Sequence, residues 1–318
     1  MRAIVNSGPG VIEYCDLPQP VPGPGQVRVR TACCGICATD LEMIAGWART
    51  GFPSVPGHEW SGVVDAVGPG VDTGLAGKPC VAENVLKDGG EVGFEHPGGY
   101  AEFLLTEAAN VRVLPEGLDL ATAALIEPLA VAVRGVGRLG AADRRSALVI
   151  GDGPVGLLIV ALLHAGGVGG VVCLGGRPKR LALAAALGAS SVGNYHEAAV
   201  PANAAYANVI EASGSASGMT TALACAAPQG KVLVIGDYGN RQDQVNWNAV
   251  LLKELTLVGS NASAGAWDEA VRLAVSGTVP LAGLVSKRYP PDQAAEALAS
   301  VRTSREVVKN LIDWRMTP

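Results

Sequence analysis

Zinc-binding residue types occur in three separate segments of the chain. Cys37 lies in CGICATD, His58 and Glu59 lie in GHEW, and Glu127 precedes Pro128 in IEPLAVA. A thiolate, an imidazole and a carboxylate are ligands that zinc accepts, and a catalytic zinc needs three protein ligands and one open position. These residues predict a single catalytic metal site, built from segments that the fold must bring together.

Charge limits the number of carboxylates at such a site. One thiolate and one carboxylate neutralise the 2+ ion and leave it able to lower the pKa of a bound alcohol. A second carboxylate would make the site net negative and weaken this effect. We therefore expect that Glu59 and Glu127 alternate at the metal, or that one of them lies behind it. Other cysteines, in strand-like or helical sequence, are interpreted as small buried hydrophobic residues, namely Cys33, Cys34, Cys80, Cys173 and Cys225.

A glycine-rich turn, GDGPVG at 151–156, offers a second kind of chemistry. The apolar run ALVI before it predicts a buried strand, and VGLLIVALL after it predicts a helix. The first N–H groups of such a helix can bind a pyrophosphate. The alternative is a tight strand-to-helix turn without a ligand. The predicted contacts are Gly151, Gly153, Pro154, Val155 and Gly156.

The end of the next strand, VVCLGG, indicates which nicotinamide cofactor is used. An NAD site usually carries an acidic residue there, whereas an NADP site carries a small residue followed by arginine. Here Gly175 and Gly176 are followed by Arg177 and Arg180. We therefore expect NADP(H) to be preferred over NAD(H), with Arg177 as the first phosphate contact. The alternative is that RPKR is a solvated helix start with Pro178 in its first turn.

The elements that position these residues suggest two domains in an α/β chain. Val-rich runs separated by Pro-Gly and Gly-Gly turns dominate the first third, and helical sequence begins near residue 119. Apolar strands then alternate with helices, which is typical of a parallel sheet covered on both faces. A further strand lies in LKELTLVGSNAS, and the tail breaks the alternation and is expected to pack on the first domain. The predicted domains are 1–128 with 264–318, and 129–263.

Composition excludes several classes of protein. The net charge of −5 comes without a basic block, which argues against nucleic acid or an anionic membrane surface as the main partner. Seven irregularly spaced cysteines favour a reducing cytoplasm over a disulfide framework. The stretch 153–176 lacks charged side chains, but its pattern predicts a helix at 155–165 and a strand at 170–174 rather than a membrane span. The chain is large enough for an active-site cleft between two domains.

Six motifs in order, CGICATD, GHEWSGVV, GGYAEF, EPLAVA, GDGPVG and ANVIEASG, resemble the medium-chain dehydrogenase/reductase superfamily and its zinc-dependent alcohol and polyol dehydrogenases. The resemblance implies a β-rich GroES-like catalytic domain, a Rossmann domain inserted into it and an active site in the cleft between them. Cys37, His58 and Glu127 match the catalytic zinc ligands, and Glu59 matches an acidic residue that can approach the metal. Glu127, where classical alcohol dehydrogenases carry cysteine, resembles the polyol branch.

The resemblance also implies roles around the metal. Asp40 would orient His58, and Thr39 would pass the alcohol proton toward solvent. Glu42 stands where many relatives have the histidine that completes this relay, so a relay through Glu42 and release through water both remain open. Residues 84–97 contain none of the four cysteines that hold a structural zinc in some relatives. One catalytic zinc and no structural zinc are expected.

These observations favour a zinc-dependent, NADP-preferring enzyme that interconverts a secondary alcohol, polyol- or cyclitol-like, and its ketone. Its partner would be a small-molecule alcohol or ketone, and the resemblance implies a homodimer or homotetramer. Two alternatives are a zinc-free quinone or enoyl reductase of the same superfamily and a catalytically silent NADPH-binding protein. Zinc-free reductases of the superfamily lack this set of zinc ligands. A silent NADPH-binding protein would bind the cofactor without turning over an alcohol.

Overall fold

The computed structural model of the chain describes residues 1–140, 145–197, 206–239, 242 and 244–316. Two compact units are present, and each consists of more than one segment. The first unit comprises Met1–Glu127, Ala270–Ser276 and Leu281–Pro318, and the second comprises Pro128–Glu269 and Gly277–Pro280. The short segments 264–269 and 277–280, which the sequence analysis placed with the catalytic domain, belong to the second unit.

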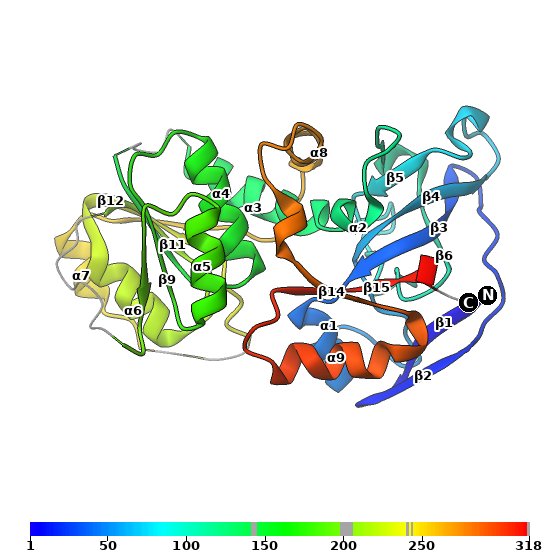
Figure 1. Cartoon of the computed structure of the whole chain (residues 1–318), viewed down its shortest axis with the longest axis horizontal. Coiled ribbons are helices and arrows are strands. Elements are labelled where there is room, and N and C mark those ends of the chain that lie inside the picture. The colour runs from blue at the N-terminus through cyan, green and yellow to red at the C-terminus, as the bar shows by residue number, and fades with distance from the viewer. Residues whose placement is uncertain (141–144, 198–205, 240–241, 243, 317–318) are drawn as a thin grey trace. The chain divides into compact units, whose positions relative to one another are not determined.

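The second unit is built on a parallel sheet of six strands among the described residues, drawn in green to yellow in Figure 1. Its strand order is β10-β9-β8-β11-β12-β13. Strands are added toward one edge of the sheet from β8 to β10 and toward the other edge from β11 to β13, so the order reverses between β8 and β11. Ligands of open parallel sheets bind at the carboxyl ends of the strands beside such a switch point. The strands are β8 (Ala147–Ile150), β9 (Val171–Gly175), β10 (Ser191–Asn194), β11 (Tyr206–Glu211), β12 (Ala226–Val234) and β13 (Thr256–Gly259).

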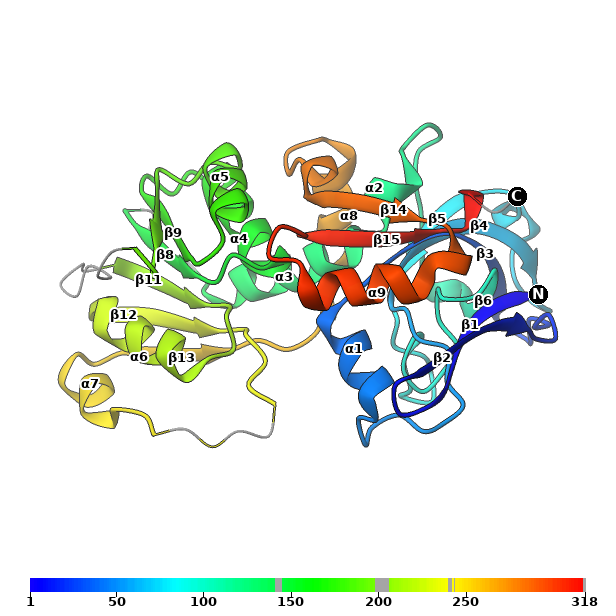
Figure 2. The same ribbon diagram turned by 60° about the horizontal axis from the view of Figure 1, so that its bottom comes forward.

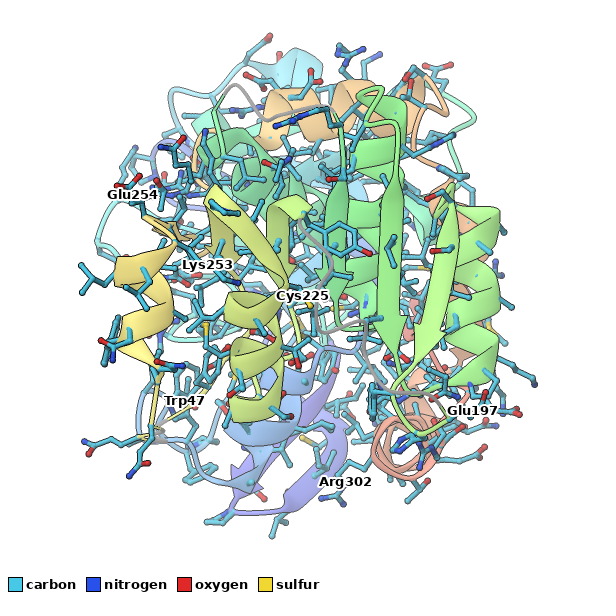
Figure 3. All side chains as sticks on the ribbon, turned by 90° about the vertical axis from the view of Figure 1, so that its left-hand side faces the viewer. Trp47, Glu197, Cys225, Lys253, Glu254 and Arg302 are labelled. Atoms are coloured by element: carbon cyan, nitrogen blue, oxygen red, sulfur yellow. The ribbon has the colours of Figure 1, made fainter. Side chains whose placement is uncertain are left out.

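Helices cover both faces of this sheet. In Figure 2, α4 and α5 lie on one face and α6 lies on the other. The buried side of α4 is almost continuously apolar, because the helix packs on β8 and β9. Lys253, labelled in Figure 3, donates to three carbonyl groups at the end of α6. The helices are α3 (Ile126–Arg138), α4 (Pro154–Ala165), α5 (Pro178–Ala186), α6 (Ala216–Cys225) and α7 (Trp247–Leu252).

The first unit is built around a mixed sheet and a separate β1–β2 hairpin. The sheet has the order β14-β15-β3-β4-β5-β7, and β6 pairs with β3 off this path. Its core includes the fully buried Trp60, Tyr100 and Leu104. The strands are β1 (Arg2–Gly8), β2 (Val11–Asp16), β3 (Gln26–Gly35), β4 (Glu59–Val67), β5 (Pro79–Ala82), β6 (Phe103–Glu107), β7 (Val111–Val113), β14 (Val285–Tyr289) and β15 (Lys309–Asp313).

The C-terminal segment completes this sheet, as the sequence analysis expected. Strand β15 runs antiparallel to β3 with Leu311 opposite Gly35, and it carries β14 on its other edge. Figure 1 shows α9 alongside β15. The other helices of the unit are α1 (Ala38–Ala45), α2 (Leu120–Ala123), α8 (Trp267–Val275), which continues from the second unit, and α9 (Ala294–Thr303). Short 3-10 turns occur at Thr73–Leu75, Ala108–Asn110, Leu281–Leu284, Pro291–Gln293 and Trp314–Met316.

Several expectations about individual segments are confirmed. The uncharged stretch 153–176 forms α4 and β9, and within the described chain no helix combines the length and apolar character needed to cross a bilayer. The five cysteines interpreted as hydrophobic residues are all buried thiols. The sequence analysis missed the β1–β2 hairpin and α1. Helix α1 begins directly after Cys37 and carries the side chains of the metal-site motif.

Candidate metal and nucleotide sites

Three of the predicted metal ligands lie together in the first unit. The ligand atoms of Cys37, His58 and Glu59 are all within 4.8 Å of one another. Cys37 is the residue that precedes α1, and His58 and Glu59 stand at the start of β4. His58 and Glu59 are buried, while Cys37 is partly exposed. A sulfur, a nitrogen and an oxygen donor therefore meet at one buried point that is reached from the side of Cys37.

Two glycines make room for this group. Gly57 has a φ of +102°, and a Cβ there would lie 2.5 Å from the ring of Tyr100 and 2.8 Å from the sulfur of Cys34. Gly35 pairs with Glu59 across β3 and β4, and a Cβ at Gly35 would lie 2.2 Å from Glu59 Oε2. Only glycine fits both the backbone conformation and the space at Gly57. The tight packing fixes where His58 and Glu59 begin their strand.

The carboxylate of Glu59 is only half satisfied by the protein. Its Oε1 accepts a hydrogen bond of 2.6 Å from Lys309 Nζ, which also donates to the carbonyl of Ile36. Burial opposes the charge on Lys309, but Glu59, Cys37 and Asp40 together outweigh it, and the pKa of Lys309 is raised. Glu59 Oε2 is buried without a hydrogen-bond partner. A buried carboxylate oxygen without a partner is costly, and a metal ion would satisfy it. The residues present therefore fit a zinc ion.

Asp40 connects His58 to the rest of the site. Its carboxylate is fully buried, and Oδ1 lies 3.2 Å from His58 Nδ1, as the resemblance implied. Oδ2 accepts from the backbone N–H of Cys37 at 2.8 Å and from the hydroxyl of Tyr100 at 3.2 Å. Burial lowers the pKa of His58, but Asp40 and Cys37 together outweigh it, and the net shift of the pKa is upward. Such an acidic partner fixes the ring orientation of a metal-binding histidine.

Glu127 lies near this group but is not one of the three clustered residues. It stands in the first turn of α3, and its side chain is buried. Burial raises the pKa of Glu127 to about 7, His58 lowers it and Glu59 raises it. The structure thus brings Glu59, rather than Glu127, closest to Cys37 and His58. The expected alternation of the two carboxylates stays a prediction.

The two predicted proton-relay residues differ in position. Thr39 Oγ1 lies 3.6 Å from the sulfur of Cys37, so its hydroxyl stands beside the metal-binding group. Glu42 is exposed on α1. Glu42 is therefore reached by water, and the choice between a relay through Glu42 and direct release to water stays open.

The predicted nucleotide turn joins β8 to α4 in the second unit. Gly151 has a φ of +121°, and a Cβ at Gly156 would lie 2.1 Å from the carbonyl oxygen of Gly151. Gly153 is the residue before the helix, Pro154 is the first helical residue and Val155 follows it. No side chain caps this helix start by a hydrogen bond. The turn has the close packing and the bare helix N-terminus that a pyrophosphate site requires.

Asp152 is a residue of this turn that the sequence analysis did not single out. It is 2% exposed, and its Oδ2 accepts from the backbone N–H groups of Gly176 at 3.0 Å and Arg177 at 2.8 Å. Its Oδ1 lies 2.5 Å from Arg177 Nη1. A Cβ at Gly175 would lie 2.6 Å from the Asp152 side chain. The glycine at the end of β9 is therefore needed to accommodate Asp152. An acidic residue inside a glycine fingerprint was the signal that could have revealed this.

The two arginines predicted to bind phosphate lie at the start of α5. Arg177 directly precedes Pro178, the first residue of α5, so this segment does form the helix start that the alternative interpretation expected. Arg180, however, is 9% exposed and is not a solvated side chain. Burial lowers the pKa of Arg180 to about 10, and Arg177 lowers it further while Asp152 raises it. Two guanidinium groups and one carboxylate leave a net positive charge at the end of β9.

Comparisons with known proteins agree with both sites. Residues 23–116 match the model of the alcohol dehydrogenase GroES-like domain, and residues 154–276 match that of the zinc-binding dehydrogenase domain. The chain belongs to the medium-chain dehydrogenase/reductase superfamily. Within it, this dehydrogenase falls in the zinc-dependent alcohol and polyol branch, as the motifs predicted. The predicted fold class, a GroES-like β-rich domain with a Rossmann domain, is confirmed.

Relatives of this dehydrogenase align along nearly their whole length. Galactitol 1-phosphate 5-dehydrogenase of Escherichia coli K12 is 26% identical over 335 residues, which cover 95% of this chain and 96% of the relative. L-threonine 3-dehydrogenase of Saccharopolyspora erythraea is 28% identical over 344 residues, 99% of each chain. These similarities show an alcohol dehydrogenase that acts on a small-molecule alcohol or ketone with a nicotinamide cofactor.

Solved structures resemble this dehydrogenase closely. A protein of Sinorhizobium meliloti, provisionally named a zinc-binding dehydrogenase and bound to NADP, is 25% identical with a TM-score of 0.92, covering 98% of both chains. Alcohol dehydrogenase TADH of a Thermus species is 26% identical with a TM-score of 0.89, covering 98% of this chain and 99% of the other. The fold is thus shared over the full length of the chain.

Proposed function

We propose that this dehydrogenase binds one catalytic zinc ion, prefers NADP(H) and interconverts a secondary alcohol, polyol- or cyclitol-like, with its ketone. The observation that supports the zinc site best is the buried, partnerless oxygen of Glu59 beside Cys37 and His58. Bound zinc would polarise the carbon–oxygen bond of the substrate, and the bound nicotinamide would exchange hydride with its carbinol carbon.

The residues of the chain have distinct tasks in this proposal. Cys37 and His58 hold the metal together with Glu59 or Glu127. Asp40 orients His58, because its Oδ1 lies 3.2 Å from His58 Nδ1 and would hold the ring in place for a metal bound at the other nitrogen. Thr39 passes the substrate proton between the hydroxyl and water, directly or by way of Glu42. Lys309 holds Glu59 Oε1, and the buried Oε2 is left without a hydrogen-bond partner in the protein.

The decisive experiment measures zinc per chain by elemental analysis of protein purified without added metal. One zinc is expected in the wild type and none in Cys37→Ser, because a structural lobe with cysteines is missing from residues 84–97. Cys15→Ser, on the β1–β2 hairpin, is the matched control and should keep its zinc. Protein without zinc that still binds NADPH would refute the proposal and favour a zinc-free reductase or a silent binding protein.

The preference for NADP(H) is supported by the net positive charge of Arg177, Arg180 and Asp152 and by the NADP bound to the Sinorhizobium meliloti protein. Arg177→Ala should weaken NADPH binding by roughly tenfold to a hundredfold, the range of one charge-assisted hydrogen bond, and leave NADH binding nearly unchanged. Arg302→Ala, at an exposed site on α9 that Figure 3 labels, controls for a change of net charge. An unchanged NADPH-to-NADH ratio in Arg177→Ala would contradict this assignment.

Assembly into a homodimer or homotetramer is supported by an exposed apolar patch of the second unit. Trp247, Leu251 and Leu252 of α7 are 64%, 72% and 80% exposed, and β13 at the sheet edge follows directly in the chain. An apolar patch beside an edge strand is typical of a subunit contact. Sedimentation should show an oligomer that Leu251→Glu with Leu252→Glu dissociates.

The domain limits and the location complete the proposal. The functional domains are proposed to comprise 1–128 with 264–318 and 129–263, limits that differ from the two compact units at Pro128, 264–269 and 277–280. Free thiols at all seven cysteines agree with a reducing cytoplasm. Neither nucleic acid nor a membrane surface is a proposed partner, because the net charge is −5 without a basic block.

A further inference from the structure

An aromatic and charged cluster lies directly beside the metal-binding group. It consists of Trp47, Arg49, Glu91, Phe94 and Glu95, and is called the Arg49 cluster below. The ring of Phe94 lies 4.8 Å from the ring of His58, with an angle of 32° between the two planes. The cluster is therefore next to a proposed zinc ligand, where a bound substrate would extend away from the metal.

Arg49 holds the cluster together. Its Nε lies 2.6 Å from Glu95 Oε1, and its Nη2 lies 2.8 Å from Glu91 Oε1. Its guanidinium carbon lies 4.4 Å from the centre of the Phe94 ring and 5.7 Å from that of Trp47. One cation thus joins two carboxylates and two aromatic rings, which fixes Phe94 against His58.

Glu91 and Glu95 belong to residues 84–97, called the lobe below. This lobe packs tightly on the segment that contains Gly57 and His58. A Cβ at Gly93 would lie 2.6 Å from the backbone of Gly57 and His58. The side chain of Asn84 donates to the carbonyl of His58 at 2.8 Å and accepts from the indole of Trp60 at 3.1 Å. The lobe therefore keeps its position relative to His58, and its charges act at a fixed place.

The charge of the cluster determines what it can accept. One guanidinium and two carboxylates sum to a net charge of −1. The side chains of Arg49, Glu91 and Glu95 are 32%, 24% and 35% exposed, so their charges are only partly screened by water. A phosphate group is held best by an arginine whose positive charge is not already paired, and here two carboxylates pair with Arg49 through its Nε and Nη2. An uncharged alcohol meets no such repulsion and finds apolar ring surface in Trp47 and Phe94.

We propose that the Arg49 cluster selects an unphosphorylated, uncharged hydroxylated substrate and disfavours its phosphate ester. The proposal rests on the alcohol dehydrogenase function proposed above and names its substrate class. Two relatives are named for phosphorylated polyols, galactitol 1-phosphate and D-arabitol phosphate.

Isothermal titration of zinc-loaded protein saturated with NADPH, which cannot accept hydride from an alcohol, tests the proposal with matched ligand pairs. The probes are galactitol with galactitol 1-phosphate and sorbitol with sorbitol 6-phosphate. A neutral polyol is expected to bind at least about fivefold more tightly than its phosphate, the effect of one unit charge near 4 Å in water. Wild-type protein that binds a phosphate ester as tightly as the neutral polyol, or that binds neither neutral polyol, would overturn the proposal.

A gain-of-binding variant provides the second measurement. Glu91→Gln with Glu95→Gln frees Arg49 and changes the cluster charge from −1 to +1. The ratio of phosphate-ester affinity to neutral-polyol affinity should rise by at least about fivefold. Glu116→Gln, whose side chain is 89% exposed, is the matched control and should leave this ratio unchanged. An unchanged ratio in the double variant would overturn the role of the cluster.

Zinc content and NADPH binding, measured on the same samples, separate the two levels of the proposal. Protein that lacks zinc or does not bind NADPH contradicts the proposed function itself, and the inference falls with it. Protein that carries zinc, binds NADPH and prefers the phosphate ester contradicts only the inference about the Arg49 cluster.

Discussion

Replacing Lys309 with methionine tests how the metal site is held before the metal binds. Lys309 and Glu59 are 3% and 2% exposed, and within the described part of the chain the Lys309 ammonium donates the hydrogen bond that Glu59 Oε1 accepts. Lys309→Met keeps most of the side-chain volume but leaves a buried carboxylate with neither oxygen paired. Breaking a buried ion pair by removing one partner costs about 3–5 kcal/mol. We expect the free energy of unfolding of metal-free protein to fall by about this amount.

The assay is urea denaturation followed by circular dichroism, with and without zinc. Zinc should recover part of the loss, because the metal gives the freed carboxylate a new partner. The double variant Glu59→Gln with Lys309→Met should also recover more than half, since replacing both partners of a buried pair is often nearly neutral.

Lys287 and Glu296 form the matched control pair. Their side chains are 54% and 61% exposed, so Lys287→Met should change the free energy of unfolding far less than Lys309→Met does. Equal losses in Lys309→Met and Lys287→Met would refute the reasoning, and so would a loss below about 1 kcal/mol at Lys309.

Three further predictions concern the same unit. Gly57→Ala should lower the free energy of unfolding by about 2–5 kcal/mol, because φ is +102° and the added methyl group meets Tyr100; a urea midpoint equal to wild type would contradict the packing. Burial raises the pKa of Glu127 to about 7, so its contribution to metal-free stability is full below about pH 4.5 and is lost as the pH rises through 7. Glu127→Gln should flatten the dependence of the free energy of unfolding on pH between pH 5 and pH 8. Parallel curves of stability against pH for wild type and variant would argue against this. Burial raises the pKa of the Cys80 thiol to about 12, so iodoacetamide at pH 8 should label metal-free protein at Cys15 and Cys37 before Cys80. Zinc should protect Cys37 from labelling. Mass spectrometry that finds Cys80 labelled first would contradict the burial of its thiol.

Local sequence predicted the features that depend on neighbouring residues. The strand–turn–helix around 151–156 follows from an apolar run, three glycines and a helical pattern within a short segment, and the structure has β8, the turn and α4 there. Cys37 and His58 were predicted as metal ligands from residue type and motif alone, and the structure brings them together with Glu59. The ends of the helices near these motifs could be located only from the structure. The start of α1 after Cys37 is an example, because α1 is short and carries a weak apolar pattern.

Contacts between distant segments were beyond the sequence. Lys309 reaches Glu59 across 250 positions because β15 pairs with β3, and the only hint was a lysine within an apolar strand. Arg49 meets the carboxylates of a lobe more than 40 positions away. Asp152 fills the space beside Gly175. This position therefore requires glycine for steric reasons, in addition to any role in the choice of cofactor.

The amino-acid sequence by itself determined which chemistry this protein can perform. Residue types decide whether a chain can bind zinc or a dinucleotide, and short-range patterns decide which residues form strands and helices. The tertiary structure decided which carboxylate lies closest to Cys37 and His58, what balances its charge and what surrounds it. These properties depend on distance and burial, and both are set only when segments far apart in the chain pack together.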